Sequence, residues 1–339
     1  MRAWQIQSTD GIDALACVDR DCGAPGPGEV RVRVRASSVN YRDLATVRDP
    51  AARNLSLPLV PNSDAAGEVV AVGSGVDEIS VGDRVASCFF QDWEDGPCSP
   101  TAMASALGGA LDGVLADEVI LRARGVVRVP AHLSYEEAAT LPCAALTAWN
   151  ALVGTARVKP GDTVLLLGTG GVSVFALQFA RLLGVRPIIT SSSDDKLARA
   201  RELGAWETIN YTNHPDWDDL VLDMTDGRGV DAVVEVGGAG TLERSIAATR
   251  VAGTIALIGV LTGGQIDPVM IMRKSLRLQG IYVGPRRMFR DMLTAVAFHE
   301  LRPVIHEVYP FDRAPEAFHA MARAGHFGKL VISNSDAGE

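Results

Sequence analysis

The sequence predicts an α/β fold in two parts, a small β domain followed by a doubly wound parallel sheet. Within residues 1–128, short apolar runs alternate with turns. From Ser134 onward, strand-like and helix-like segments alternate, which is typical of a parallel sheet with helices on both faces. At Val164–Ser173, an apolar run leads through a glycine-rich turn into an apolar, helix-like segment.

The predicted β domain covers residues 1–128. Its clearest strand follows the turn Pro25–Gly28, where valines alternate with arginines along Glu29–Arg35. This alternation predicts a strand with one buried face and one solvent-exposed face. Ala65–Gly73 and Val81–Ala86 have the same character.

The second predicted domain, residues 129–280, begins with a helix over 135–140, because Ser134 and Glu137 have the spacing of a capping box. Strands are expected at 163–167, 186–190, 207–210, 231–236, 254–260 and 276–283. Helices are expected at 172–184, 194–203, 216–225 and 241–250.

Residues 281–339 form a tail with helices near 287–299 and 314–324 and a strand over 329–333. We expect the tail to complete the sheet and return to the β domain.

The glycine-rich turn predicts a binding site for a pyrophosphate. Gly168, Gly170 and Gly171 separate the strand-like run from the helix. Glycine lets the backbone approach a ligand without a Cβ clash. The N–H groups and the dipole at a helix N-terminus then attract an anion.

Composition argues against several classes of partner. The chain of 339 residues has a net charge of −9, whereas nucleic acids and acidic membranes select basic surfaces. Its five cysteines lack C-x-x-C spacing, so we expect no disulfide framework. We find neither a signal peptide nor an apolar run of about 20 residues, the length of a membrane helix. We therefore expect a cytoplasmic protein that binds neither nucleic acid nor membrane.

Several local stretches resemble the medium-chain dehydrogenase/reductase superfamily across nearly the whole chain. They are Ser38–Asp43, Pro61–Glu68, Val81–Val85, Leu146–Trp149, Gly168–Ser173, Gly204–Ala205, Ile209–Tyr211 and Val283–Arg286. The sequence is most similar to quinone-oxidoreductase-like members that use NADP(H), and to alcohol dehydrogenase-like relatives. The resemblance implies a GroES-like β domain, a Rossmann domain and an assembly that is usually a dimer or a tetramer, of which we expect the homodimer.

The resemblance places Asn40, Ser63 and Cys143 where zinc alcohol dehydrogenases of the superfamily hold their catalytic zinc. Only Cys143 offers a good zinc ligand. The region of the structural zinc retains just Cys88 and Cys98 of four cysteines. We therefore expect a site without metal, with Cys143 as a small buried residue.

Without a metal, hydrogen-bond donors must polarise a substrate oxygen. The resemblance places the loop Asn40–Asp43 near the nicotinamide, so Asn40, Tyr41 and Asp43 are the catalytic candidates. Tyr41 would donate to a developing enolate or alkoxide, and Asn40 would bind substrate or the nicotinamide ribose. The alternative is that Arg42 and Asp43 form an ion pair and Tyr41 only packs.

The cofactor expected is NADP(H). Ser191 stands where NAD-dependent members carry the acid that binds a ribose 2′-OH. The donors that a 2′-phosphate requires are Ser191, Ser192, Ser193, Lys196 and Tyr211. Asp194 and Asp195 weaken this assignment unless they only enrich the first turn of a helix.

The resemblance also implies the remaining cofactor contacts. Thr147 would face the nicotinamide, Gly237 and Ile258–Val260 would line its half of the site, and Tyr282–Gly284 would approach its carboxamide. Gly168, Thr169, Gly170, Gly171 and Val172 would bind the pyrophosphate, with Arg286 and Lys329 nearby unless these are ordinary surface charges. Ser173 replaces the third glycine of the fingerprint, and we expect its hydroxyl to bond a helix carbonyl.

Phe89–Trp93 opens a segment that either lines the substrate site or fills the β-domain core or a subunit contact. These features predict a zinc-independent, NADP(H)-dependent oxidoreductase that transfers a hydride to or from a small apolar carbonyl, enone or quinone. The alternatives are NAD(P)-dependent alcohol oxidation, with a weak metal at Cys143, and a nicotinamide-binding regulator without turnover.

Overall fold

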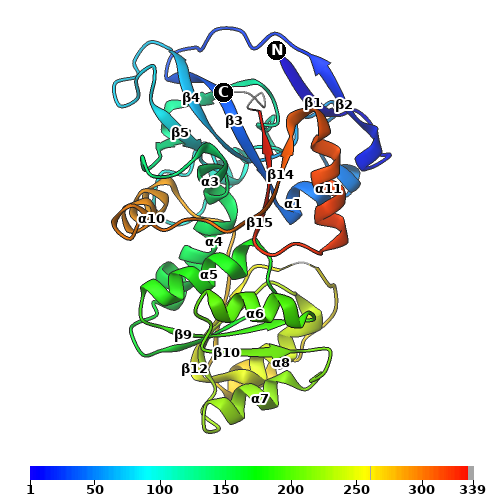
Figure 1. The fold of residues 1–339 in the computed structure, drawn as a ribbon, viewed down its shortest axis with the longest axis vertical. Coiled ribbons are helices and arrows are strands. Elements are labelled where there is room, and N and C mark those ends of the chain that lie inside the picture. Colours follow the sequence, from blue (N-terminus) through cyan, green and yellow to red (C-terminus); the bar gives the residue numbers. More distant parts are fainter. Residues whose placement is uncertain (260, 335–339) are drawn as a thin grey trace. The chain divides into compact units, whose positions relative to one another are not determined.

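The computed structural model describes residues 1–259 and 261–334 (Figure 1). The chain divides into two compact units. One comprises Met1–Leu146 and the segment from Gly284 onward, and the other comprises Thr147–Val283.

The first unit is built on a seven-stranded sheet in the order β14-β15-β3-β4-β5-β7, with β6 also paired to β3. These strands are β3 (Glu29–Val39), β4 (Asp64–Val72), β5 (Arg84–Ser87), β6 (Glu118–Arg122), β7 (Val126–Arg128), β14 (Ile305–Pro310) and β15 (Lys329–Ser333). A separate hairpin joins β1 (Arg2–Ile6) and β2 (Leu15–Asp19). The alternation in β3 is confirmed, because Val30, Val32 and Val34 are buried and Arg33 is exposed.

The helices of this unit are α1 (Tyr41–Arg48), α2 (Pro100–Met103), α3 (Tyr135–Ala139), α10 (Arg286–Phe298) and α11 (Ala314–Arg323). The predicted capping box of α3 is confirmed, with Ser134 and Glu137 bonded reciprocally. The unit extends past residue 128 to Leu146, because α3 packs on β3 and β4. The tail joins the same sheet, with β15 antiparallel to β3 and Leu330 opposite Val39.

The second unit is a six-stranded, wholly parallel sheet in the order β10-β9-β8-β11-β12-β13. Its strands are β8 (Thr163–Leu166), β9 (Arg186–Ser191), β10 (Glu207–Asn210), β11 (Val230–Glu235), β12 (Thr249–Leu257) and β13 (Arg277–Gly280). Its helices are α5 (Gly171–Leu182), α6 (Asp194–Glu202), α7 (Trp217–Met224), α8 (Ala239–Ala248) and α9 (Val269–Arg273). The helical segment α4 (Leu146–Trp149) lies between two π-helical turns, Leu141–Ala145 and Asn150–Ala156.

This strand order is that of the predicted doubly wound sheet. The chain moves outward from β8 to β9 and β10, then returns to the other side of β8 with β11. Ligands bind such sheets at the carboxyl ends of the strands, where the order reverses. The strand predicted over 276–283 is shorter than expected, because β13 ends at Gly280, which pairs with Leu257, the last residue of its neighbour β12.

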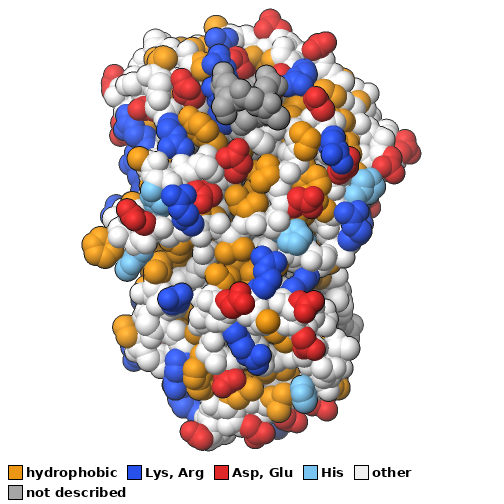
Figure 2. Space-filling model, in the orientation of Figure 1, with side chains coloured by type: hydrophobic (Ala, Val, Ile, Leu, Met, Phe, Trp, Pro, Cys, Tyr) orange, Lys and Arg blue, Asp and Glu red, His pale blue; other side chains and the backbone are white. Residues whose placement is uncertain are grey.

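The charged surface reflects the composition, in which 41 acidic residues stand against 32 lysines and arginines. Figure 2 shows acidic and basic side chains interspersed over the face that is drawn. In the part of the chain that the structure describes, no helix has both the length and the apolar character needed to span a membrane.

A buried ion-pair network fixes the start of β11. The Asp231 carboxylate, whose side chain is 6% exposed, accepts bonds from Arg228 at 2.6 Å, Arg250 at 2.6 Å and the Thr163 N–H at 2.9 Å. Burial alone would raise the pKa of Asp231, but the bonds from Arg228, Thr163 and Arg250 outweigh it and lower the pKa to about 2.

We predict that Asp231→Asn lowers the free energy of unfolding at pH 7 by about 2 kcal/mol, since one pKa unit corresponds to about 1.4 kcal/mol. A lowered pKa means that this stabilisation is present above about pH 4 and is lost as the pH falls toward 2. Urea unfolding at pH 7 and pH 3 measures it, with Asp223→Asn at an exposed aspartate as control. A loss that is the same at both pH values would contradict the assignment.

Candidate active site

The glycine-rich turn of the second unit leaves open space before the N-terminus of α5. Gly168 has φ +69°, which favours glycine, and its N–H donates to the Thr190 hydroxyl at 3.2 Å. Gly170 is the N-cap residue of α5, and a Cβ built on it would meet no atom within 4 Å. An anionic group can therefore approach the first N–H groups of this twelve-residue helix. Thr169 is buried, and Gly171 and Val172 are half-buried at the start of the helix.

Ser173 has a structural role that the sequence did not predict correctly. Its hydroxyl donates to the carbonyl of Leu167 at 2.6 Å, and the residue is 1% exposed. Leu167 follows β8, so the bond ties α5 to the end of the strand and not, as we expected, to a helix carbonyl. The hydroxyl thus spans the strand–helix junction where the resemblance has a glycine.

The ends of β9 and β10 bring five predicted residues together: Ser191, Ser192, Ser193, Lys196 and Tyr211. Ser191 lies opposite Asn210 in the parallel pair, and its carbonyl accepts from the Tyr211 N–H at 3.1 Å. The Ser191 and Ser193 hydroxyls accept from the N–H groups of Ser193 and Lys196, at 3.3 and 3.4 Å.

Ser192 and Tyr211 are exposed, and burial lowers the pKa of Lys196. Asp194 and Asp195 lie in the first turn of α6, the alternative that we weighed for them.

A glutamate that sequence reasoning missed organises the end of β11. Glu235 is fully buried, and its Oε1 accepts from the N–H groups of Gly237 at 2.7 Å and Gly238 at 3.1 Å and from the Thr241 hydroxyl at 2.7 Å. Its Oε2 accepts from the Ser245 hydroxyl. The signal was present in the sequence, since an acid ends an apolar strand one residue before the glycine pair Gly237-Gly238.

The backbone of Glu235 also positions two residues that we expected to line the nicotinamide half of the site. The Glu235 carbonyl accepts from the N–H groups of Ile258 and Gly259, at 2.8 and 2.9 Å. A Cβ on Gly259 would lie 2.0 Å from the carbonyl carbon of Val236, so only glycine fits there. The predicted contact at Val260 lies outside the described residues.

The other residues expected around the nicotinamide lie, in sequence, near the two points where the chain passes from one unit to the other. Thr147 is buried and Tyr282 is 44% exposed. The carbonyl of the buried Val283 accepts from Asn150 Nδ2 at 2.7 Å. A Cβ on Gly284 would lie 3.2 Å from both Leu146 and Met288.

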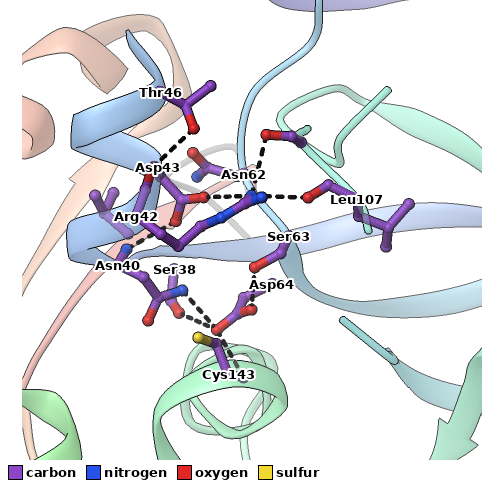
Figure 3. Close-up of polar contacts among 12 residues, drawn as sticks. Ser38, Asn40, Arg42, Asp43, Thr46, Asn62, Ser63, Asp64, Leu107 and Cys143 are labelled. Atoms are coloured by element: carbon purple, nitrogen blue, oxygen red, sulfur yellow. Dashed lines mark hydrogen bonds and ion pairs between the residues drawn. The ribbon is translucent and has the colours of Figure 1, made fainter. Parts of the chain in front are cut away.

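A buried carboxylate also organises the polar cluster of the first unit. Figure 3 shows four residues directed at Asp64, which is fully buried at the start of β4. It accepts from Asn40 Nδ2 at 2.9 Å, Ser63 Oγ at 2.6 Å, Ser38 Oγ at 3.3 Å and the Cys143 N–H at 3.2 Å. Burial raises the pKa of Asp64, while Lys329, Ser63 and Asn40 oppose that rise.

Asp43, one of the three catalytic candidates, lies inside the protein as an ion-pair partner of Arg42. It is fully buried, with Oδ1 3.1 Å from Arg42 Nη1 and Oδ2 accepting from the Asn40 N–H at 2.8 Å. Arg42 also donates to the carbonyls of Leu107 and Gly108, at 2.7 and 3.1 Å. The ion-pair alternative therefore describes Arg42 and Asp43. Tyr41 does not pack in the interior, since it is 42% exposed.

The two basic residues expected near the pyrophosphate are engaged within the first unit. Lys329 is 2% exposed, and its Nζ donates to Asn40 Oδ1 at 2.6 Å and to the Val39 carbonyl at 2.9 Å. Arg286 is 5% exposed and donates to Glu94, Glu78 and the Val126 carbonyl. Neither is an ordinary surface charge, since the cation of each is buried and bonded to groups of the first unit.

Zinc does not fit the side chains at the three corresponding positions. The Asn40 amide bonds Lys329 and Asp64, and the Ser63 hydroxyl donates to Asp64. Burial and the charge of Asp64 raise the pKa of Cys143, which disfavours the thiolate that zinc binds. Burial likewise raises the pKa of Cys88 to about 12. Within residues 1–259 and 261–334, no three His, Cys, Asp or Glu side chains are grouped to hold a metal.

The aromatic segment belongs largely to the interior. Phe89 and Phe90 are buried against each other in an edge-to-face arrangement, with ring centroids 4.7 Å apart. Trp93 packs on Phe90 and donates its indole N–H to the Gly96 carbonyl at 2.9 Å. Of the two alternatives, the structure supports core packing for the two phenylalanines.

Comparisons with known proteins agree with this architecture. Residues 26–131 match the family model for the alcohol dehydrogenase GroES-like domain, and residues 171–297 match the model for zinc-binding dehydrogenases. The chain is 44% identical to a zinc-type alcohol dehydrogenase-like protein of Schizosaccharomyces pombe, over 90% of this chain and 91% of that protein. A Pseudomonas aeruginosa quinone oxidoreductase is 34% identical over 76% of this chain and 73% of its own.

Solved structures show the same similarity. A putative alcohol dehydrogenase of Sinorhizobium meliloti is 40% identical, with a TM-score of 0.92 over 98% of each chain. A structure described as an NAD-dependent alcohol dehydrogenase is 36% identical, with a TM-score of 0.90 over 99% of this chain and 100% of its own. A mycobacterial protein in complex with NADPH is 29% identical, with a TM-score of 0.83 over 98% of this chain and 100% of its own.

Proposed function

Because the chain belongs to the medium-chain dehydrogenase/reductase superfamily, as an oxidoreductase of the alcohol dehydrogenase or quinone oxidoreductase type, we propose that it acts with NADP(H) and without zinc. The substrate would be a small apolar carbonyl, enone or quinone. Reduction of a carbonyl would give an alcohol, and the reverse reaction would oxidise that alcohol. The observation that carries this proposal is the donor set at Asn40, Ser63 and Cys143, whose amide, hydroxyl and neutral thiol do not suit zinc.

The second unit offers the groups that would hold the cofactor. The open N-terminus of α5 would take the pyrophosphate, and Ser192, Lys196 and Tyr211 would take the 2′-phosphate. Glu235 would act indirectly by fixing Gly237 and Gly259. When bound, the nicotinamide supplies or accepts the hydride.

The chain's own contribution would be a polar surface for the substrate oxygen. Tyr41 is the exposed member of the loop Asn40–Asp43 and would donate its phenolic proton to the oxygen as negative charge develops. The buried Asp43 fixes this loop by accepting from the Asn40 N–H and pairing with Arg42.

One finding favours NAD(H) and alcohol oxidation as the second candidate. The structure described as an NAD-dependent alcohol dehydrogenase is 36% identical, whereas the NADPH complex is 29% identical. The absence of a carboxylate at Ser191 favours NADP(H) over this alternative, because a carboxylate there would bind a ribose hydroxyl and repel a phosphate.

We also propose that a second copy of the chain covers the edge of the parallel sheet. Among the described residues, β13 is an edge strand of that sheet, and such edges expose unpaired backbone groups. Exposed apolar side chains lie close to it in sequence: Leu261, Ile266, Val269, Met270 and Met272. Light scattering should give the mass of a homodimer, and Met272→Lys should shift it toward monomer. A wild-type monomer at micromolar concentration would contradict the dimer.

For cofactor choice, we predict that Lys196→Met weakens NADPH binding about tenfold, because one lost ionic contact to phosphate is worth about 1.4 kcal/mol. NADH binding should change less than twofold, since NADH lacks the 2′-phosphate. Fluorescence titration with both coenzymes measures this, with Lys159→Met at an exposed lysine of the same unit as control. Tighter binding of NADH than NADPH by the wild type would sink the assignment.

For catalysis, we predict turnover of at least one enone, quinone or aldehyde with NADPH by protein purified without added zinc. Tyr41→Phe should lower kcat by about 100-fold, the lower range for a lost general acid, with unchanged NADPH affinity. Tyr135→Phe, which loses the hydroxyl of a tyrosine stacked under Arg84, is the matched control.

Two outcomes would contradict this reading. Stoichiometric zinc in the active protein would refute zinc independence. Intact NADPH binding without turnover across enones, quinones, aldehydes and alcohols would instead indicate a nicotinamide-binding regulator.

A further inference from the structure

A buried ammonium occupies the polar cluster around Asp64. Lys329 is the first residue of β15, and its backbone N–H bonds the Val304 carbonyl at 3.0 Å. The preceding Gly328 has φ +82°, and a Cβ there would lie 2.4 Å from that carbonyl oxygen. The backbone therefore fixes where the lysine side chain starts, and the side chain runs inward to 2% exposure.

The ammonium is linked to the carboxylate through one amide. Lys329 Nζ donates to Asn40 Oδ1 at 2.6 Å, and Asn40 Nδ2 donates to Asp64 Oδ2 at 2.9 Å. With its oxygen facing a cation and its nitrogen facing an anion, the amide has one favourable orientation. Lys329, Asn40 and Asp64 thus form a chain that joins the start of β15, the residue after β3 and the start of β4.

Stability alone does not account for this arrangement. Removing a charged group from water costs several kcal/mol, and well-packed apolar side chains are often as stable as a buried ion pair. Burial lowers the pKa of Lys329, and Asp64, Cys143 and Asp43 oppose that effect. This costly pair is bonded to the side chain of Asn40, the residue that precedes the proposed donor Tyr41.

We propose that Lys329 is a positioning residue of the active site, whose ammonium acts through Asn40 in place of a metal cation. The ammonium holds the Asn40 amide between itself and Asp64. Asn40 is the N-cap residue of α1, so this contact fixes the start of the helix, whose first residue is Tyr41. This proposal rests on the proposed function only for its catalytic readout. It differs from the expected pyrophosphate contact, because the ammonium is used inside the first unit.

A double-mutant cycle tests the proposal. Lys329→Met should lower kcat by about 10- to 100-fold, the range for a displaced catalytic group, with NADPH affinity within about twofold of wild type. In an Asn40→Ala background, the same change should cost less than about threefold, because Lys329 acts through the side chain already removed. Lys329→Arg should recover part of the loss by restoring a charged donor.

Lys274→Met is the matched control. Lys274 is a half-buried lysine of the second unit, and its ammonium donates to the carbonyls of Ile246, Ala247 and Thr249 at the end of α8. Its loss should lower the unfolding midpoint while changing kcat less than about twofold, which separates positioning from a general loss of stability.

Multiplicative losses in the cycle would overturn the proposal. An effect confined to NADPH affinity would also overturn it and place Lys329 on the cofactor. If Lys329→Met does not fold, the same cycle is measured with Lys329→Arg and Asn40→Ala. Losses of kcat that do not multiply then support the proposal, and losses that multiply overturn it. If the wild type turns over no substrate, the proposed function fails, and unfolding midpoints then test the link: non-additive shifts support it and additive shifts overturn it.

Discussion

A buried carboxylate must receive hydrogen bonds or charge from its surroundings, and this constraint organises both candidate sites. In the first unit the carboxylate is Asp64, fully buried at the start of β4. The bonds that satisfy it come from the end of β3, from its neighbour Ser63 and from the helical segment that carries Cys143. The carboxylate therefore joins the segments that carry the three zinc-equivalent positions.

Glu235 meets the same constraint in the second unit with different donors. Within the part of the chain that the structure describes, two backbone N–H groups and two hydroxyls donate to this carboxylate. Those N–H groups belong to the loop between β11 and α8, at the carboxyl end of the sheet where ligands bind. A residue that touches no cofactor can thus determine the shape of a cofactor loop.

The sequence predicted what depends on local patterns. The spacing of Ser134 and Glu137 predicted a capping box, and the alternation along Glu29–Arg35 predicted a half-buried strand, because neighbours in sequence settle both. The pairing of Lys329 with Val39 joins residues 290 positions apart, and no local pattern encodes which carbonyl an inward lysine will meet. For the same reason, the sequence left open whether Asp43 pairs with Arg42 and did not predict that Arg286 pairs with Glu94, since such partners follow from tertiary packing.

Charge balance connects the altered metal positions to Lys329. With their side chains ionised, Asp43 and Asp64 contribute two negative charges to the polar cluster, and Arg42 and Lys329 contribute two positive charges. A zinc ion bound to the neutral donors Asn40 and Ser63 would add two uncompensated charges in a poorly hydrated interior, which is costly. A site with anionic thiolate ligands can accept the metal because the ligands offset its charge. The neutral side chains of Asn40 and Ser63 and the internal ammonium of Lys329 are therefore consistent with each other. The neutral side chains do not offset the charge of a metal cation, and the ammonium supplies the positive charge that balances Asp64.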